Sequence, residues 1–112
     1  MNLYFAIREN KGDYPRVVVI RRKAENHIDT IGVGYWYFDP FSNHFEVVRP
    51  ERIGVKHPQC AIAFSKDEAV KLYLDGVRDV IADYENDLAR RQDSLAAHRE
   101  TLALPVEEII EF

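Results

Sequence analysis

The feature that most constrains the fold is a helical pattern spanning residues 65–104 of a chain of 112 residues. Ser65 and Glu68 form a capping box at its start, and Pro105 ends it. At 1.5 Å per residue, one continuous helix would be roughly 57 Å long. A domain of this size has a radius of gyration of about 13 Å. Such a helix would therefore extend beyond the rest of the domain.

The apolar positions of this segment change along its length. Residues 69–81 form a broad apolar face, which is typical of a helix lying on a sheet. The stripe then narrows and keeps heptad spacing, which is typical of a helix–helix interface. The stripe consists of Tyr84, Leu88, Arg91, Leu95, His98 and Leu102. We expect it to join two copies as a homodimer or to contact another protein. The alternative is a bend near Arg90–Ser94 that folds the helix back as a hairpin, although this segment contains no Gly or Pro.

The first 64 residues are typical of strands and turns. Five short β-rich runs, at residues 3–7, 14–22, 30–38, 44–49 and 60–64, are joined mostly by short connections. We therefore predict an α+β fold: a five-stranded antiparallel meander followed by one long C-terminal helix that packs on the sheet and overhangs it. The chain would be a single domain, with residues 1–64 as the sheet, 65–104 as the helix and 105–112 as a short docked tail. That tail would form either a helical turn or an extended segment that adds to a sheet edge or enters a partner's groove.

The stretch "TIGVGYWYF" raises the question of whether its rings are core or surface. Strand alternation puts Tyr35 and Tyr37 on one face and Trp36 and Phe38 on the other. Two glycines on the second face leave a shallow trough that a side chain, a backbone or a ligand can enter. We expect the rings to be mainly structural, with Trp36 as the candidate for an exposed aromatic.

Charge is uneven along the chain. Residues 1–65 carry nine Lys/Arg and seven Asp/Glu, a net of +2, whereas residues 66–112 carry six and twelve, a net of −6. In a meander, alternate strands end at one edge, so six cations would gather on one rim as a surface for phosphates, nucleic acid or an acidic protein. They are Arg21, Arg22, Lys23, Arg49, Arg52 and Lys56. The alternative is solvated loop charges, and a net charge of −4 argues against a dedicated nucleic-acid binder.

An acidic helix face could meet a basic partner, or it could simply be solvated. It contains Asp79, Asp83 and Asp87. The pair His57 and Cys60 lacks a second Cys/His pair at zinc-site spacing, so we expect no metal. We find no catalytic motif, such as a Gly-rich phosphate loop or G-x-S-x-G, and expect neither a cofactor nor an enzyme.

Composition and these patterns together favour an interaction protein. Hydrophobic residues make up 46% and charged residues 30% of the chain, as in ordinary globular domains. No apolar run is long enough to cross a membrane, and a single cysteine fits the cytoplasm. We predict a small cytoplasmic regulatory module, dimeric and acting on a macromolecular partner. Accessory factors and inhibitors of phages or mobile elements are an analogy at the level of class. A nucleic-acid-binding β-domain is the alternative, and a small enzyme is the remote one.

Overall fold

The computed structural model describes residues 1–11, 14–86 and 92–110, which form an α+β fold of two sheets and two α-helices. The four-stranded sheet has the order β6-β1-β2-β7. Its strands are β1 (Asn2–Lys11), β2 (Tyr14–Lys23), β6 (Cys60–Ala63) and β7 (Val106–Ile110). The three-stranded sheet contains β3 (Glu25–Ile28), β4 (Val33–Asp39) and β5 (His44–Val48). The helices are α1 (Lys66–Asn86) and α2 (Gln92–Leu102), and a short 3₁₀ helix, η1 (Pro50–Arg52), follows β5.

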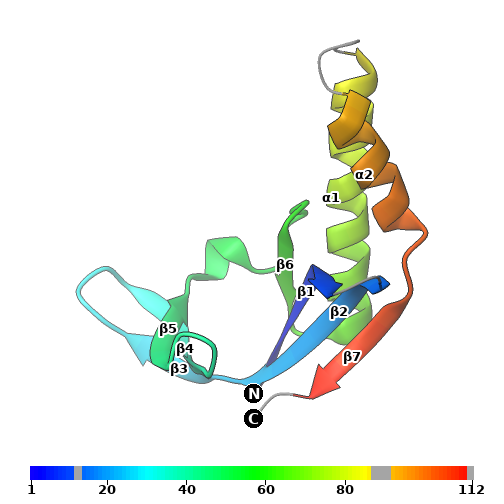
Figure 1. Cartoon of the computed structure of the whole chain (residues 1–112). Helices are drawn as coiled ribbons and strands as arrows, with labels where there is room; N and C mark the ends of the chain where they lie inside the picture. Colours follow the sequence, from blue (N-terminus) through cyan, green and yellow to red (C-terminus); the bar gives the residue numbers. More distant parts are fainter. Residues whose placement is uncertain (12–13, 87–91, 111–112) are drawn as a thin grey trace.

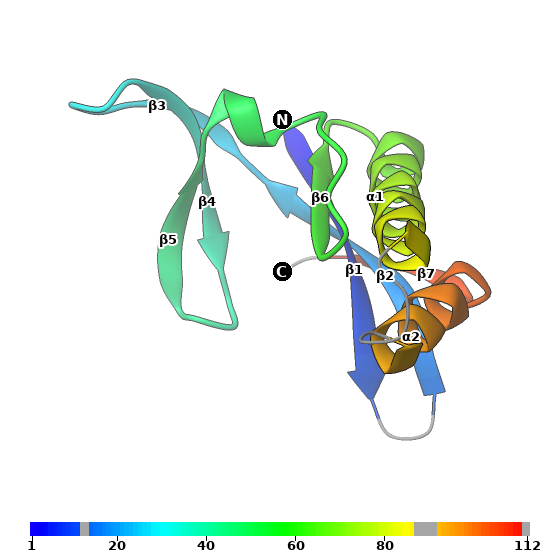
Figure 2. The same cartoon turned by 90° about the horizontal axis from the view of Figure 1, so that it is seen from above.

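The four-stranded sheet is the middle layer of the fold. Helix α1 covers one face of the four-stranded sheet, with α2 beside α1 and near the end of β1, and the three-stranded sheet lies toward the other face (Figure 1, Figure 2). β2 leads into β3 through Ala24, which is buried and donates its backbone N–H to the carbonyl of Met1 at 2.8 Å. The four-stranded sheet therefore separates two cores.

The helix-side core lies between the four-stranded sheet and α1. It contains Ala6, Val17, Val19, Ala61, Ala63, Ala69, Tyr73 and Val77. The inter-sheet core lies between the two sheets and is completed by Tyr35 and Tyr37 of β4. Its buried members are Leu3, Phe5, Val18, Ile20, Ala24, Val48 and Ile62. Because successive residues of β2 point to opposite faces, its run from Val17 to Ile20 is buried on both sides.

Helix α1 begins where the capping box predicts. The backbone N–H of Glu68 donates to the Ser65 hydroxyl at 3.2 Å, and Asp67 and Glu68 lie in the first turn, where the helix dipole favours negative charge. The sheet below α1 carries small side chains, among them Ala61 and Ala63, which let the helix lie close to the strands.

The predicted five-stranded meander is wrong, and only the α+β class holds. β6 leaves the neighbourhood of β5 and pairs antiparallel with β1, while β3, β4 and β5 form a separate sheet. Residues 25–28 form a strand that we did not predict. The physical reason is burial: both faces of β1 and β2 are apolar, so each needs its own covering layer, and one sheet with one helix could not provide both.

The tail forms a strand rather than a helical turn. β7 pairs in parallel with β2, with Val106 opposite Val17 and Ile109 opposite Ile20. Pro105 accepts a hydrogen bond through its carbonyl from the Val17 N–H at 2.7 Å, which begins the pairing. The chain therefore closes one edge of the four-stranded sheet with its last described residues.

The predicted single helix over residues 65–104 is also wrong. α1 ends at Asn86 and α2, which starts at Gln92, packs back along it, as in the alternative fold-back. The hairpin still extends beyond the sheet (Figure 1). Folding back covers apolar surface of α1 that would face water on an isolated helix, and this gain can offset the lost helical hydrogen bonds.

Candidate interaction surface

The predicted dimer stripe makes contacts within its own chain. The rings of Tyr84 and His98 lie 5.4 Å apart across the two helices, and Leu102 packs against the helix-side core. Leu95 is half-buried, and Arg99 forms an ion pair with Glu85. Leu88 and Arg91 lie outside the described residues. The homodimer stays a prediction, but for the described part of the stripe its original reason, a lack of cover in its own chain, no longer holds.

The six rim cations have separate neighbourhoods. Arg22 is buried between the sheets, 3.6 Å from Asp39 and over the rings of Phe5 and Tyr37. Arg49 contacts Asp29 at 2.6 Å. The other four cations lie at three further places: beside the start of β6, beside α1 and on β2.

Arg52 donates to the carbonyl of Cys60, at the start of β6. Lys56 lies 3.4 Å from Asp79 of α1, so this contact joins one predicted basic position to one predicted acidic position. Arg21 is half-buried on β2, and Lys23 is exposed at the end of that strand. Asp83 is exposed on α1, and Asp87 lies outside the described residues.

His57 has a local structural role. Its Nδ1 accepts hydrogen bonds from the backbone N–H groups of Gln59 and Cys60, both at 3.1 Å. Burial, with a smaller effect of Arg52, lowers the pKa of His57, which fits a ring that accepts through Nδ1. Burial raises the pKa of the Cys60 thiol. Within the described ranges, no three His, Cys, Asp or Glu side chains are grouped as a metal site would require.

The aromatic stretch divides between core and surface. Tyr35 and Tyr37 pack against the inter-sheet core. Trp36 and Phe38 point to the opposite face of β4, where Trp36 is paired with Val47 and Phe38 with Phe45 of β5. We call this group of four residues the outer aromatic face. It is formed by Trp36, Phe38, Phe45 and Val47.

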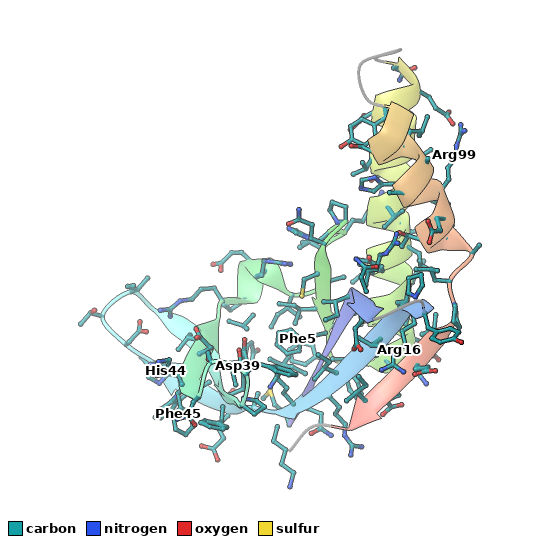
Figure 3. The ribbon with its side chains drawn as sticks, in the orientation of Figure 1. Phe5, Arg16, Asp39, His44, Phe45 and Arg99 are labelled. Carbon is teal, nitrogen blue, oxygen red and sulfur yellow. The ribbon has the colours of Figure 1, made fainter. Side chains whose placement is uncertain are left out.

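The rings of the outer aromatic face touch one another and remain open to solvent. Ring centroids lie 4.6 Å apart for Trp36 and Phe45 and 5.4 Å apart for Phe38 and Phe45. Trp36 is 38%, Phe38 37% and Phe45 61% exposed. In Figure 3, Phe5 lies between the sheets and Phe45 lies on the far side of the three-stranded sheet. Exposed rings in contact are the unusual feature of this surface, because large aromatic side chains are usually buried.

The predicted glycine trough is filled by the chain's own side chains over Gly34, whereas nothing lies within 4 Å of a Cβ placed on Gly32. Gly34 is buried, and a Cβ placed on it would lie 2.6 Å from Val47 Cγ1 and 3.3 Å from Arg49 Nη1. Gly34 therefore lets Val47 and Arg49 pack against the β4 backbone. The space that we considered for a ligand is used to build the surface.

A charged pair borders the outer aromatic face at the Gly34 end. Arg49 Nη2 donates to Asp29 at 2.6 Å, and Arg49 Nη1 donates to the carbonyl of Gly32 at 3.2 Å. This side-chain bond, helped by the backbone N–H groups of Gly32 and Ile31, holds the pKa of Asp29 far below its usual range. The His27 ring lies 5.3 Å from Trp36 and its Nε2 lies 3.4 Å from Asp29. The rim thus carries both signs of charge in a fixed arrangement.

Sequence reasoning placed Trp36 and Phe38 on one face and singled out Trp36 as exposed, but it did not bring Phe45 and Val47 to that face. Alternation in residues 44–48 places Phe45 and Val47 on one face, and this signal was readable. What alternation cannot supply is the register that puts Phe45 beside Phe38. The contribution of His27 needed the unpredicted strand β3.

Comparison with protein-family models, with curated proteins and with solved structures gives no match. Neither helix in the described part of the chain is long and apolar enough to cross a membrane.

Proposed function

We propose that this protein is a protein-interaction module and that the outer aromatic face is its binding surface. The observation that carries the proposal is the contiguous exposed set of Trp36, Phe38 and Phe45 on one face of a three-stranded sheet. Interface centres are enriched in aromatic residues, and tryptophan is among the residues that contribute most to binding.

The size of the surface fits the apolar centre of an interface. From their exposed fractions, the three rings leave roughly 200 to 340 Å² open to solvent, given about 150 to 250 Å² for a whole aromatic side chain. A standard interface covers about 800 Å² on each partner, with an apolar centre and a polar rim. Glu25, His27 and the Asp29–Arg49 pair provide such a rim.

The charges beside the rings favour protein over nucleic acid as the occupant. A surface that stacks bases combines exposed rings with cations directed at phosphates. Here the Arg49 guanidinium is bonded to Asp29 and to a backbone carbonyl, and Glu25 is the β3 residue paired with Trp36. Both features make the electrostatic field at Trp36 less favourable to a phosphate chain.

We take the occupant to be a second copy of this chain. Two flat sheet faces can pack on each other about 10 Å apart, with rings interdigitating. A two-fold axis that lies in the interface and points toward the Gly34 end would bring Asp29–Arg49 of one copy near the same pair of the other, so that each charge meets one of opposite sign. This moves the predicted homodimer from the helix stripe to the sheet.

The test measures self-association of the full chain. Wild type is compared with W36S/F45S by light scattering over a micromolar concentration series. We expect a concentration-dependent dimer that the double substitution weakens by more than about tenfold, because two central aromatic residues are lost. The matched control is Tyr14→Ser, since Tyr14 is 81% exposed at the start of β2. It should leave the dimer unchanged.

Trp36 also provides an internal optical probe, because it is the sole tryptophan of the chain. Its fluorescence emission should shift to shorter wavelength as concentration rises in wild type and in Y14S. A protein that stays monomeric throughout, with Trp36 emission independent of concentration, would rule out the second copy as occupant. Equal dimerisation of W36S/F45S would place the dimer elsewhere.

A further inference from the structure

A second candidate site lies away from the outer aromatic face, where the helical hairpin meets the four-stranded sheet. A cleft of about 410 Å³ opens there, within the range of about 300 to 1,000 Å³ typical of small-molecule sites. Its walls come from four segments that are distant in sequence: the end of β1, the loop before β6, α1 and α2. Figure 2 shows α2 beside α1 and over the end of β1. The side chains that line the cleft include Arg8, Asn10, Pro58, Tyr73, Val77 and Thr101.

Arg8 is held at the cleft by a set of fixed hydrogen bonds. Its Nη1 donates to the carbonyl of Ala97 at 2.9 Å and to the Thr101 hydroxyl at 2.7 Å, and its Nε donates to Asn10 Oδ1 at 2.7 Å. Nη2 makes a longer contact of 3.4 Å with the exposed Glu100. Nη2 is therefore the part of the guanidinium with donor capacity to spare. Because Asn10 accepts through its oxygen, its amide nitrogen is left as a donor.

Tyr73 adds a donor whose surroundings are unusual. The residue is only 2% exposed, its ring packs in the helix-side core, and it lines the cleft. No hydrogen bond to the Tyr73 hydroxyl is found among the described residues. This oxygen is not one of the fully enclosed polar atoms that lack a partner in the described part of the chain, so it is open to the cleft, where a ligand can accept its hydrogen bond. Burial raises the pKa of Tyr73, so the hydroxyl keeps its proton and can donate.

We infer that this cleft binds a small monocarboxylate with a short apolar body. Arg8, Asn10 and Tyr73 all offer donors, so the ligand must present acceptors, and one cation matches one negative charge. Glu100 beside Arg8 disfavours a ligand with two charges. Pro58 and Val77 give the cleft an apolar wall for the rest of the ligand.

A bound carboxylate would connect parts of the fold that are otherwise joined through few polar contacts. Arg8 belongs to β1 and Tyr73 to α1, and Arg8 is already bonded to α2 through Thr101. A ligand bonded to both Arg8 and Tyr73 would therefore hold the hairpin onto the sheet. Binding should protect the backbone amides near Thr101 from hydrogen exchange.

The experiment is an NMR titration of the full chain with sodium benzoate as the probe. Benzamide, the uncharged analogue, and inorganic phosphate are titrated in parallel. We expect saturable shifts of the Asn10, Gln59 and Thr101 backbone amides with benzoate, in the millimolar range or tighter. Benzamide and phosphate should each bind more weakly by about tenfold or more.

The decisive variant is Tyr73→Phe, which keeps the ring and removes the hydroxyl. It should weaken benzoate binding by about tenfold, whereas Tyr14→Phe, at an exposed tyrosine, should bind as wild type does. Unchanged binding by Y73F would overturn the inference. So would benzoate shifts confined to the outer aromatic face, absence of saturable binding, or equal binding of phosphate at these amides.

Discussion

The two sheets of this protein differ in how many faces they bury. The four-stranded sheet is covered by helices on one face and by the three-stranded sheet on the other, and the four residues from Val17 to Ile20 are all buried. The three-stranded sheet buries only the face that carries Tyr35 and Tyr37, while Trp36 and Phe45 stay exposed on the other. The same β-rich composition thus serves a packed interior in one sheet and an open aromatic surface in the other.

This difference separates stability from recognition. A residue in a sheet that is covered on both faces contributes to stability by filling space. An exposed ring contributes little to folding and is available for a partner. Two glycines let the comparison be tested with the same substitution. Gly76 lies in α1, which covers the four-stranded sheet, and Gly34 lies in the three-stranded sheet.

The largest effect is expected from Gly76→Ala in α1. A Cβ there would lie 2.6 Å from the carbonyl carbon of His57 and 2.8 Å from the backbone nitrogen of His57. Backbone atoms cannot move aside easily. Helix propensity alone would favour alanine by up to about 1 kcal/mol. We expect instead a loss of about 3 kcal/mol in the free energy of unfolding, measured with urea. A variant as stable as wild type would show that α1 does not lie this close to the loop.

A smaller effect is expected from Gly34→Ala in β4. Its Cβ would meet a side chain first, Val47 Cγ1 at 2.6 Å, and then the Val48 carbonyl oxygen at 3.2 Å. The expected cost is about 1 to 2 kcal/mol. In a double-mutant cycle with Val47→Ala, most of this cost should be recovered, because the closest clash is removed. Strictly additive losses would mean that Val47 does not fill the space above Gly34.

The smallest effect concerns the charged rim. The pKa of Asp29 is lowered by its bond from Arg49, so the ionised carboxylate stabilises the folded state. This stabilisation is complete above the ordinary aspartate pKa of about 3.9 and is lost as the pH falls below it. Asp29→Asn should lower the melting temperature at neutral pH, and the difference from wild type should shrink under acidic conditions.

Asp83→Asn is the matched control for that measurement, because Asp83 is exposed on α1. Its difference from wild type should vary less with pH. If D29N and wild type differed by the same amount at every pH, the Asp29–Arg49 bond would not contribute as described.

Local patterns predicted local structure well. Ser65 caps α1 as its spacing with Glu68 indicates, and alternation separates Tyr35 and Tyr37 from Trp36. The continuous apolar run of β2 is typical of a strand covered on both faces, and it could have indicated a third layer. We did not draw that conclusion from it.

Pairings between distant segments could not be predicted in the same way. Nothing in residues 60–63 indicates β1 rather than β5 as their neighbour, and nothing in residues 106–110 indicates a parallel pairing with β2. Strand β3 has the sequence ENHI, without a strong strand signal. The sequence between α1 and α2 contains no Gly or Pro to mark the end of α1. For the candidate surface, alternation placed Trp36 and Phe38 on one face, but the β4–β5 register that brings Phe45 beside Phe38 and the strand that contributes His27 were not predicted.

The late position of β7 has a consequence for biosynthesis. On the ribosome the β1–β2 hairpin emerges first, with apolar side chains on both faces, yet the partner for the free edge of β2 arrives only with residues 106–110. Nascent chains interrupted before that point would present an unpaired edge and an unfinished helix-side layer, the surfaces by which strands aggregate. Premature termination within α2 should therefore yield fragments that aggregate more readily than the full chain.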